Sequence, residues 1–184
     1  GSFSDPQDPS TIVQTDDDHT IGGTNCAFTA NATSIFSGIG EQDVDDGCTT
    51  LELIFTFSGI TNYNNPAISY WRWYTNSPPS GANPGADWWQ VKISDDGGST
   101  WHYIENNISS DISWRNFSFR VQDYINLTPQ IKLRFIASDS TRLGQYLDGG
   151  SLVEAAIDDI SIYEAQANST SINDIKNNQV VELL

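Results

Sequence analysis

The stretch DWWQVKISDDGGSTWHYIE, residues 87–105, determines the fold class predicted for this chain of 184 residues. Apolar and polar side chains alternate over 87–94, and strand-like sequence resumes over 100–105 after a turn rich in Asp, Gly and Ser. Alternation with a period of two is typical of a strand with one buried face, and Gly residues permit the positive φ angles of a tight turn. The stretch therefore predicts two antiparallel strands joined by a hairpin.

The turn itself, SDDGGSTW at 94–101, fits the Asp-box pattern that is best known from sialidase propellers. A propeller requires blades that repeat every ~40–50 residues, whereas this chain has one such box and no repeat. Asp96 is placed to accept hydrogen bonds from the turn amides, and Trp101 is expected to pack beneath the hairpin. We therefore interpret the box as architecture and not as a sign of glycosidase chemistry.

Short strand signals separated by turns fill most of the remaining chain. They occupy 25–30, 51–58, 67–75, 114–122, 130–137 and 152–163. The connections are rich in Gly, Pro and Asn, and no helical periodicity persists. About eight antiparallel strands predict an all-β fold, a two-sheet antiparallel β-sandwich of the jelly-roll kind. We expect a polar lead-in at 1–15, this domain at 16–164 and a linker or tail at 165–184.

The composition excludes some partners and favours an extracellular location. A net charge of -16 and a pI near 4.1 disfavour nucleic acid and anionic membranes, because phosphate contacts need clustered cations. No apolar run approaches the ~20 residues of a membrane span. Cys26 and Cys48 are not in a CxxC pair, so zinc is not expected. In a secreted chain they would form one disulfide, and the alternative is two unrelated buried thiols.

Two motifs resemble the MAM domain, an extracellular jelly roll of receptors and astacin-type proteases. DHTIGG at 18–23 is similar to the family's Asp-His-Thr-x-Gly motif, and AAIDDISIY at 155–163 is similar to its closing strand. DVDDGCTTL at 43–51 looks like the bacterial MAM-like modules that follow secreted metallopeptidases and adhesins. The resemblance covers 16–164 and does not reproduce the cysteine pattern of the eukaryotic members.

The tail carries a second resemblance. SINDI at 171–175 and VVELL at 180–184 look like the linker that enters a type IX secretion sorting domain in Bacteroidetes proteins. This resemblance implies a larger exported parent protein, secreted or held at the cell surface, with neighbouring domains as partners.

Acidic clusters near both ends of the domain suggest structural calcium, since a hard cation takes six to eight oxygen ligands. The first and last strands of a jelly roll lie side by side, so the clusters can meet, and the MAM resemblance also implies a metal near its two motifs. If Ile160 and Ile162 face the core, alternation places Asp158 on their side. The alternative is a set of solvated acidic loops. The candidate ligands are Asp16, Asp18, Asp43, Asp45, Asp158 and Asp159.

Alternation also places cations and aromatic rings on the non-core faces of four strands. Such a surface suits a sugar, an acidic sugar or a peptide, because rings stack on apolar faces and Arg pairs with carboxylates. The alternative is an ordinary solvated face. Core packing is expected for Trp71, Trp73, Trp89, Trp101 and Trp114. The candidate ligand-binding residues are Tyr70, Arg72, Tyr74, Trp88, Lys92, Arg120 and Arg134.

Catalytic motifs are not apparent. The chain has two histidines, His19 and His102, and no HExxH, GxSxG or Cys–His arrangement. We therefore expect a non-catalytic, calcium-stabilised extracellular accessory module that binds carbohydrate or a surface partner in adhesion. A purely structural spacer in a secreted metallopeptidase or adhesin is the alternative. A polysaccharide-active enzyme, such as a jelly-roll lyase using Tyr and Arg, is the third hypothesis.

Overall fold

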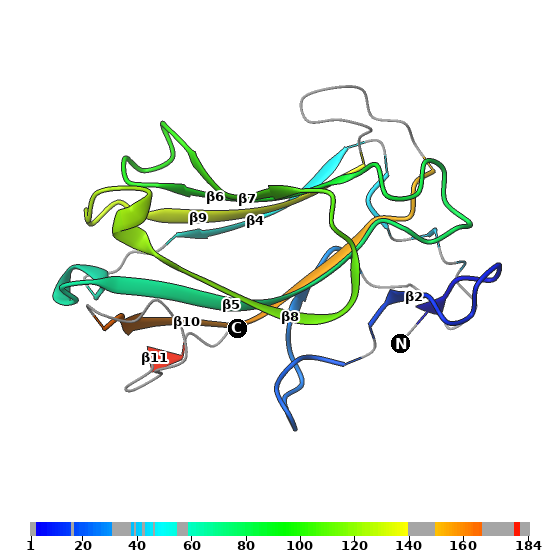
Figure 1. Cartoon of the computed structure of the whole chain (residues 1–184), viewed down its shortest axis with the longest axis horizontal. Coiled ribbons are helices and arrows are strands. Elements are labelled where there is room, and N and C mark those ends of the chain that lie inside the picture. The colour runs from blue at the N-terminus through cyan, green and yellow to red at the C-terminus, as the bar shows by residue number, and fades with distance from the viewer. Residues whose placement is uncertain are drawn as a thin grey trace.

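The chain folds into two antiparallel sheets that pack face to face, which confirms the all-β sandwich predicted from the sequence (Figure 1). The structure is a computed structural model. It describes residues 3–15, 17–30, 38, 40–41, 43–45, 47–54, 59–139, 150–166 and 179–180. None of the helical segments among these residues has the length and apolar character of a membrane span.

The lower layer of Figure 1 is here named the β5 sheet, and its strand order is β11-β10-β5-β8. β3 also pairs with β10, so the first and last strands of the expected domain lie side by side. The strands are β3 (Ala27–Phe28), β5 (Pro66–Thr75), β8 (Asp111–Arg120), β10 (Glu154–Glu164) and β11 (Gln179–Val180).

The upper layer of Figure 1 is named the β6 sheet, with the order β4-β9-β6-β7. Its strands are β4 (Cys48–Ile54), β6 (Trp88–Ser94), β7 (His102–Asn107) and β9 (Lys132–Ser138). A separate pair, β1 (Phe3–Ser4) and β2 (Ile12–Gln14), and two short 3-10 turns, η1 (Ile60–Asn62) and η2 (Val121–Asp123), complete the described elements. The hairpin predicted from 87–105 joins β6 to β7.

The core lies between the two sheets and follows the alternation of the sequence in β6 and β9. Val91 and Ile93 of β6 and Leu133 of β9 are fully buried, while Lys92, Lys132 and Arg134 keep part of their surface in solvent. Burial of aliphatic and aromatic side chains from both inner faces is the main stabilising contribution in such a sandwich. The alternation in β6 and β9 therefore determines which of their side chains face solvent.

The side-chain phase of β5 is the reverse of the one expected from the sequence. Tyr70 and Tyr74 are 0% exposed inside the sandwich, so the prediction that they and Arg72 lie on an outer face is wrong. The carboxylate of Glu105 in β7 accepts hydrogen bonds from Tyr70 Oη (2.6 Å), Arg72 Nε (3.1 Å) and Trp89 Nε1 (3.1 Å). Buried polar groups are tolerated where they are paired in this way.

The closing strand β10 also differs from simple alternation. Its pairing with β5 shifts register between Asp158 and Ser161, and Asp159 has a φ of 48°. A bulge adds one residue and reverses the facing of the side chains beyond it. Asp158 pairs with Trp71 on the outer face, while Ile160 and Ile162 belong to the core. The expectation that Asp158 shares their side is wrong.

The two cysteines are free thiols, so the predicted disulfide is wrong. Cys48 begins β4 in the β6 sheet, whereas Cys26 directly precedes β3, which pairs into the β5 sheet. Cys48 is exposed and Cys26 is half-buried. Burial, with a smaller effect of nearby aspartates, raises the pKa of the Cys26 thiol to about 11.

Candidate functional site

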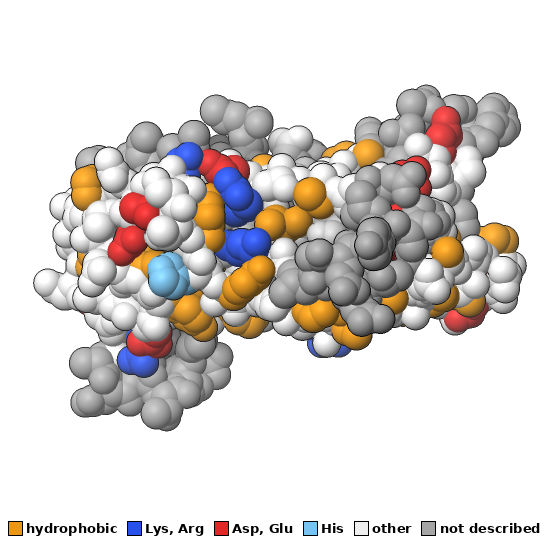
Figure 2. Space-filling view, turned by 90° about the horizontal axis from the view of Figure 1, so that it is seen from above, with side chains coloured by type: hydrophobic (Ala, Val, Ile, Leu, Met, Phe, Trp, Pro, Cys, Tyr) orange, Lys and Arg blue, Asp and Glu red, His pale blue; other side chains and the backbone are white. Residues whose placement is uncertain are grey.

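The outer side of the β6 sheet gathers charged and aromatic side chains from all four strands and from the turn before β7. We name it the cationic face and define it by Glu52, Trp88, Lys92, Trp101, Tyr103, Lys132 and Arg134. Figure 2 views the molecule from this side and shows Lys and Arg side chains grouped beside hydrophobic ones. Three of the eight Lys and Arg residues of a chain with net charge -16 therefore lie together.

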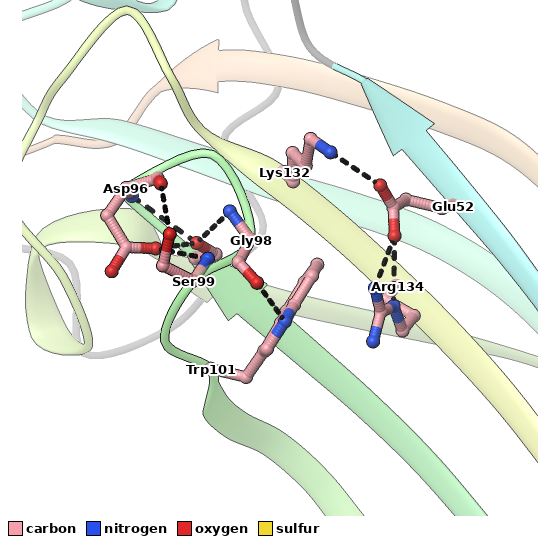
Figure 3. Close-up of polar contacts among 8 residues, drawn as sticks. Glu52, Asp96, Gly98, Ser99, Trp101, Lys132 and Arg134 are labelled. Atoms are coloured by element: carbon pink, nitrogen blue, oxygen red, sulfur yellow. Dashed lines mark hydrogen bonds and ion pairs between the residues drawn. The ribbon is translucent and has the colours of Figure 1, made fainter.

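A single carboxylate is shared by two of these cations (Figure 3). Glu52 Oε1 accepts a hydrogen bond from Lys132 Nζ at 2.8 Å, and Glu52 Oε2 accepts from Arg134 Nη2 at 2.5 Å and Nε at 3.0 Å. These hydrogen bonds hold the pKa of the Glu52 carboxyl below its usual value. The pairing fixes the Arg134 guanidinium in one orientation above the sheet.

The Asp-box turn places Trp101 against that guanidinium. Asp96 accepts hydrogen bonds from the amides of Ser99 (2.8 Å) and Thr100 (2.9 Å), as its position in the motif predicts. Trp101 Nε1 donates to the carbonyl of Gly98 at 2.9 Å. The Arg134 guanidinium carbon lies 4.0 Å from the Trp101 ring centroid, within the range of a cation–π contact. The turn therefore positions an aromatic side chain on the cationic face.

A second cation–π pair stands beside the first. Lys92 Nζ lies 4.7 Å from the ring centroid of Tyr103, and the Tyr103 residue is 42% exposed. The register places Lys92 opposite Arg134 on β9 and opposite Tyr103 on β7. Glu52, Arg134, Lys92 and Tyr103 thus form one row across four strands.

Three of the seven predicted ligand-binding residues lie on this face: Lys92 and Arg134, which are opposite each other, and Trp88, four residues along β6. Arg120 lies on β8 in the other sheet, where it is exposed and its Nε is 3.1 Å from Asp123 Oδ2. Tyr70, Arg72 and Tyr74 lie in the interior, as described above. The seven residues therefore do not form one surface.

Sequence reasoning missed the contributions of Glu52, Trp101, Tyr103 and Lys132 to the site. The sequence predicts core packing for Trp101, although its place as the last residue of the Asp box is a usable signal. Tyr103 lies two residues before the inward-facing Glu105, but a register shift opposite Val91 and Lys92 turns it to the outer face. Simple alternation gives no sign of that shift.

The outer face of the β5 sheet is different, because the segment around residues 17–28 lies against part of it (Figure 1). The His19 ring stacks on Trp71 with centroids 3.6 Å apart and an interplanar angle of 15°. The backbone N–H of His19 donates to Asp158 Oδ2 at 2.8 Å, and His19 Nδ1 lies 2.7 Å from Asp159 Oδ2. Thr20 Oγ1 donates to Asp159 Oδ1 at 2.5 Å. The two motifs that resemble the MAM domain therefore contact each other.

The predicted metal ligands separate into two groups along β10. Asp18 directly precedes His19, whose backbone N–H binds Asp158, and both aspartates lie near Cys26. Both carboxylate oxygens of Asp18 are buried without a hydrogen-bond partner among the described residues. Asp43 lies instead near Glu154, and Asp45 lies near Asp43. Glu154 is four residues, or on the order of 13 Å, along the strand from Asp158. Asp16 lies outside the described residues. No group of three or more metal-ligating side chains is found among those described.

A pocket of about 200 Å³ lies next to these acids, lined among others by Asp18, Cys26, Trp73 and Glu154. Burial is the main cause that raises the pKa of Glu154 to about 8, and its closeness to Asp43 adds to the effect. Burial and Asp45 raise the pKa of Asp43 to about 6. The pocket is therefore acidic, half-covered and chemically unlike the cationic face.

Comparison with known proteins leaves this chain without a family assignment. No family model matches the sequence, and no curated protein matches it. Among solved structures, the structure of TmCBM61 in complex with β-1,4-galactotriose is similar with a TM-score of 0.37 and 13% sequence identity, covering 66% of this chain and 67% of that chain. At that level of similarity, function must be inferred from the geometry of this chain.

Proposed function

We propose that this chain is a non-catalytic accessory module that binds carbohydrate through the cationic face. The observation that carries the proposal is the cationic face, on which the solvent-accessible rings of Tyr103 and Trp101 each lie beside a cation. Sugar rings stack on aromatic faces, and their hydroxyl groups accept hydrogen bonds from Lys and Arg. No other described surface of this acidic chain combines three cations with aromatic rings in this way.

We further propose that the module belongs to a larger exported protein, of the MAM-like kind that accompanies secreted metallopeptidases and adhesins. The contact of His19 and Thr20 with Asp158 and Asp159 supports this proposal, because the residues that carry the resemblance bind each other across 139 to 140 positions of sequence.

Structural calcium remains part of the proposal. The buried, unpartnered carboxylate oxygens of Asp18 support a cation held by Asp18 and Asp158, because an unpaired buried carboxylate is costly. Such a cation would offset that cost and fix the covering segment on the β5 sheet. We expect the melting temperature to fall on chelation and to recover with calcium. A melting temperature that chelation leaves unchanged would contradict calcium at this position. So would a chelation-induced fall in Asp18→Asn as large as that of the native chain.

Binding is tested by electrophoresis in native gels that contain single polysaccharides, with Tyr103→Ala and Trp88→Ala beside the native chain. We expect retardation by at least one polysaccharide and a loss of about tenfold in affinity for Tyr103→Ala, as for an aromatic residue central to an interface. Tyr124→Ala is the matched control, since Tyr124 is 37% exposed but follows β8 in the other sheet. No retardation across a broad panel would favour the spacer alternative and overturn the proposal.

A further inference from the structure

We infer that the cationic face selects an acidic polysaccharide, and that Lys92 contacts its carboxylate or sulfate groups. The inference rests on the proposed function, since it names the ligand class of the same face. Lys92, Lys132 and Arg134 are accompanied on the face by the single carboxylate of Glu52, on a chain whose net charge is -16.

Lys92 is the cation of this group that has no carboxylate partner among the described residues. Lys92 lies over the ring of Tyr103, whereas Lys132 and Arg134 both bind Glu52. Lys92 also stands opposite Arg134 in the β6–β9 ladder. Like charges at directly opposed positions of neighbouring strands repel each other. An anion placed between these two side chains relieves the repulsion.

The nearest acids of the fold are engaged elsewhere. Asp96 in the adjoining turn binds Ser94, Ser99 and Thr100, and Asp95 accepts hydrogen bonds from Asn126. Glu105 of β7 faces the interior and binds Tyr70 and Arg72. None of these carboxylates contacts Lys92 in the described structure, so an anion bound at Lys92 would have to come from a ligand.

The negative charge of the whole chain limits how an acidic polysaccharide can bind. A chain of net charge -16 is repelled by a polyanion at long range, so adsorption by bulk charge is not expected. At physiological ionic strength charges more than ~8 Å apart are largely screened, whereas contacts at short range persist. Binding to a polyanion therefore has to come from a local cluster such as Lys92 with Arg134.

The test uses two pairs of polysaccharides that differ in charge on the same backbone. They are polygalacturonate with its methyl-esterified form, and dextran sulfate with dextran. The proteins are the native chain, Lys92→Gln and Arg120→Gln, the last of which removes one positive charge from the other sheet. Affinity electrophoresis at physiological ionic strength should show retention by an acidic member that exceeds its neutral counterpart. Lys92→Gln should weaken this retention about tenfold, and Arg120→Gln should leave it unchanged.

The outcomes separate this inference from the proposed function. Equal retention by acidic and neutral members, lost in Tyr103→Ala, would overturn the anion inference and leave carbohydrate binding in place. Acid-selective retention that Lys92→Gln and Arg120→Gln affect equally would overturn the role of Lys92. If neither pair of polysaccharides retains the native chain, the inference is overturned. The proposed function is overturned only if no polysaccharide of the broad panel retains it. Selectivity for polygalacturonate or for dextran sulfate would support the inference and identify carboxylate or sulfate.

Discussion

The two outer faces of the sandwich differ in whether the chain covers them. On the β5 sheet, His19 lies over Trp71 and binds Asp159, so aromatic rings that would otherwise be exposed become part of the packing. On the β6 sheet, Trp101 and Tyr103 lie beside cations in solvent-accessible positions. The motifs DHTIGG and AAIDDISIY therefore pack together on one face, whereas the ligand-binding surface proposed above lies on the other face.

The contrast depends on β5 turning Tyr70 and Arg72 inward, and Glu105→Ala tests this most directly. Removing the carboxylate leaves the Arg72 charge and two further donors unpaired in the interior. We expect the free energy of unfolding to fall by about 3–5 kcal/mol, the usual cost of breaking a buried ion pair. Denaturant unfolding of the variant measures this loss.

Glu52→Ala is the matched control on the open face, because Glu52 also serves two cationic partners there. A partly solvated pair contributes less, about 1 kcal/mol or below. Equal losses in the two variants would contradict an interior location of Glu105 and the inverted phase of β5.

The sequence was sufficient to predict the sandwich and the facing of β6 and β9. In these strands one set of alternate residues is apolar and the other set carries Lys and Arg. Only one orientation of each strand therefore buries the apolar set. In β5 the sequence AISYWRWYT places aromatic rings on both faces. Hydrogen bonds to Glu105, 33 to 35 residues away along the chain, hold Tyr70 and Arg72 in the interior. The alternation within β5 does not indicate that contact.

The candidate site was predictable only in part for a similar reason. Lys92 and Arg134 follow from alternation, and their meeting follows once β6 and β9 are neighbours. Tyr103 and Asp158 are displaced from simple alternation by register shifts in β7 and β10. A bulge depends on how a strand fits its partner, so it is a property of the pair and not of one sequence segment.

The acidic pocket on the covered face should make stability depend on pH through Glu154. Its pKa is about 8 in the folded chain, above its value in the unfolded chain, so the folded state binds the proton more tightly. Its stabilising contribution is therefore complete at acidic pH and is lost as pH rises towards 8, by on the order of 3 kcal/mol. Thermal melts without divalent cations, from pH 5 to pH 8, should show this decline.

Glu154→Gln should flatten that decline, while the remaining slope reflects Asp43, whose pKa is about 6. Glu164→Gln, at the exposed end of the same strand, should retain the full dependence. A pH profile of Glu154→Gln that matches the native chain would contradict a protonated, buried Glu154.

The two histidines are associated with different sheets, so the same substitution, histidine to alanine, tests each face in turn. His19→Ala removes the stack on Trp71 and the contact with Asp159, and we expect a loss of about 2 kcal/mol. For a domain of this size that corresponds to a fall in melting temperature of roughly 4–8 °C. His102 is exposed in β7, so His102→Ala should change the melting temperature little. Weaker polysaccharide binding in His19→Ala, measured below its melting range, would contradict the separation of the two faces.

Two neighbouring glycines in the Asp-box turn offer the smallest and most local test of the open face. Gly97 and Gly98 have φ angles of 74° and 98°, so an alanine at either position costs about 1 kcal/mol of backbone strain. A Cβ at Gly97 meets nothing within 4 Å, whereas a Cβ at Gly98 would lie 3.2 Å from Cζ2 of Trp101. We therefore expect similar small falls in melting temperature for Gly97→Ala and Gly98→Ala, and weaker polysaccharide retention for Gly98→Ala alone. If both variants bind as the native chain does, the placement of Trp101 by the turn has no part in binding, and the row from Glu52 to Tyr103 must be sufficient for recognition.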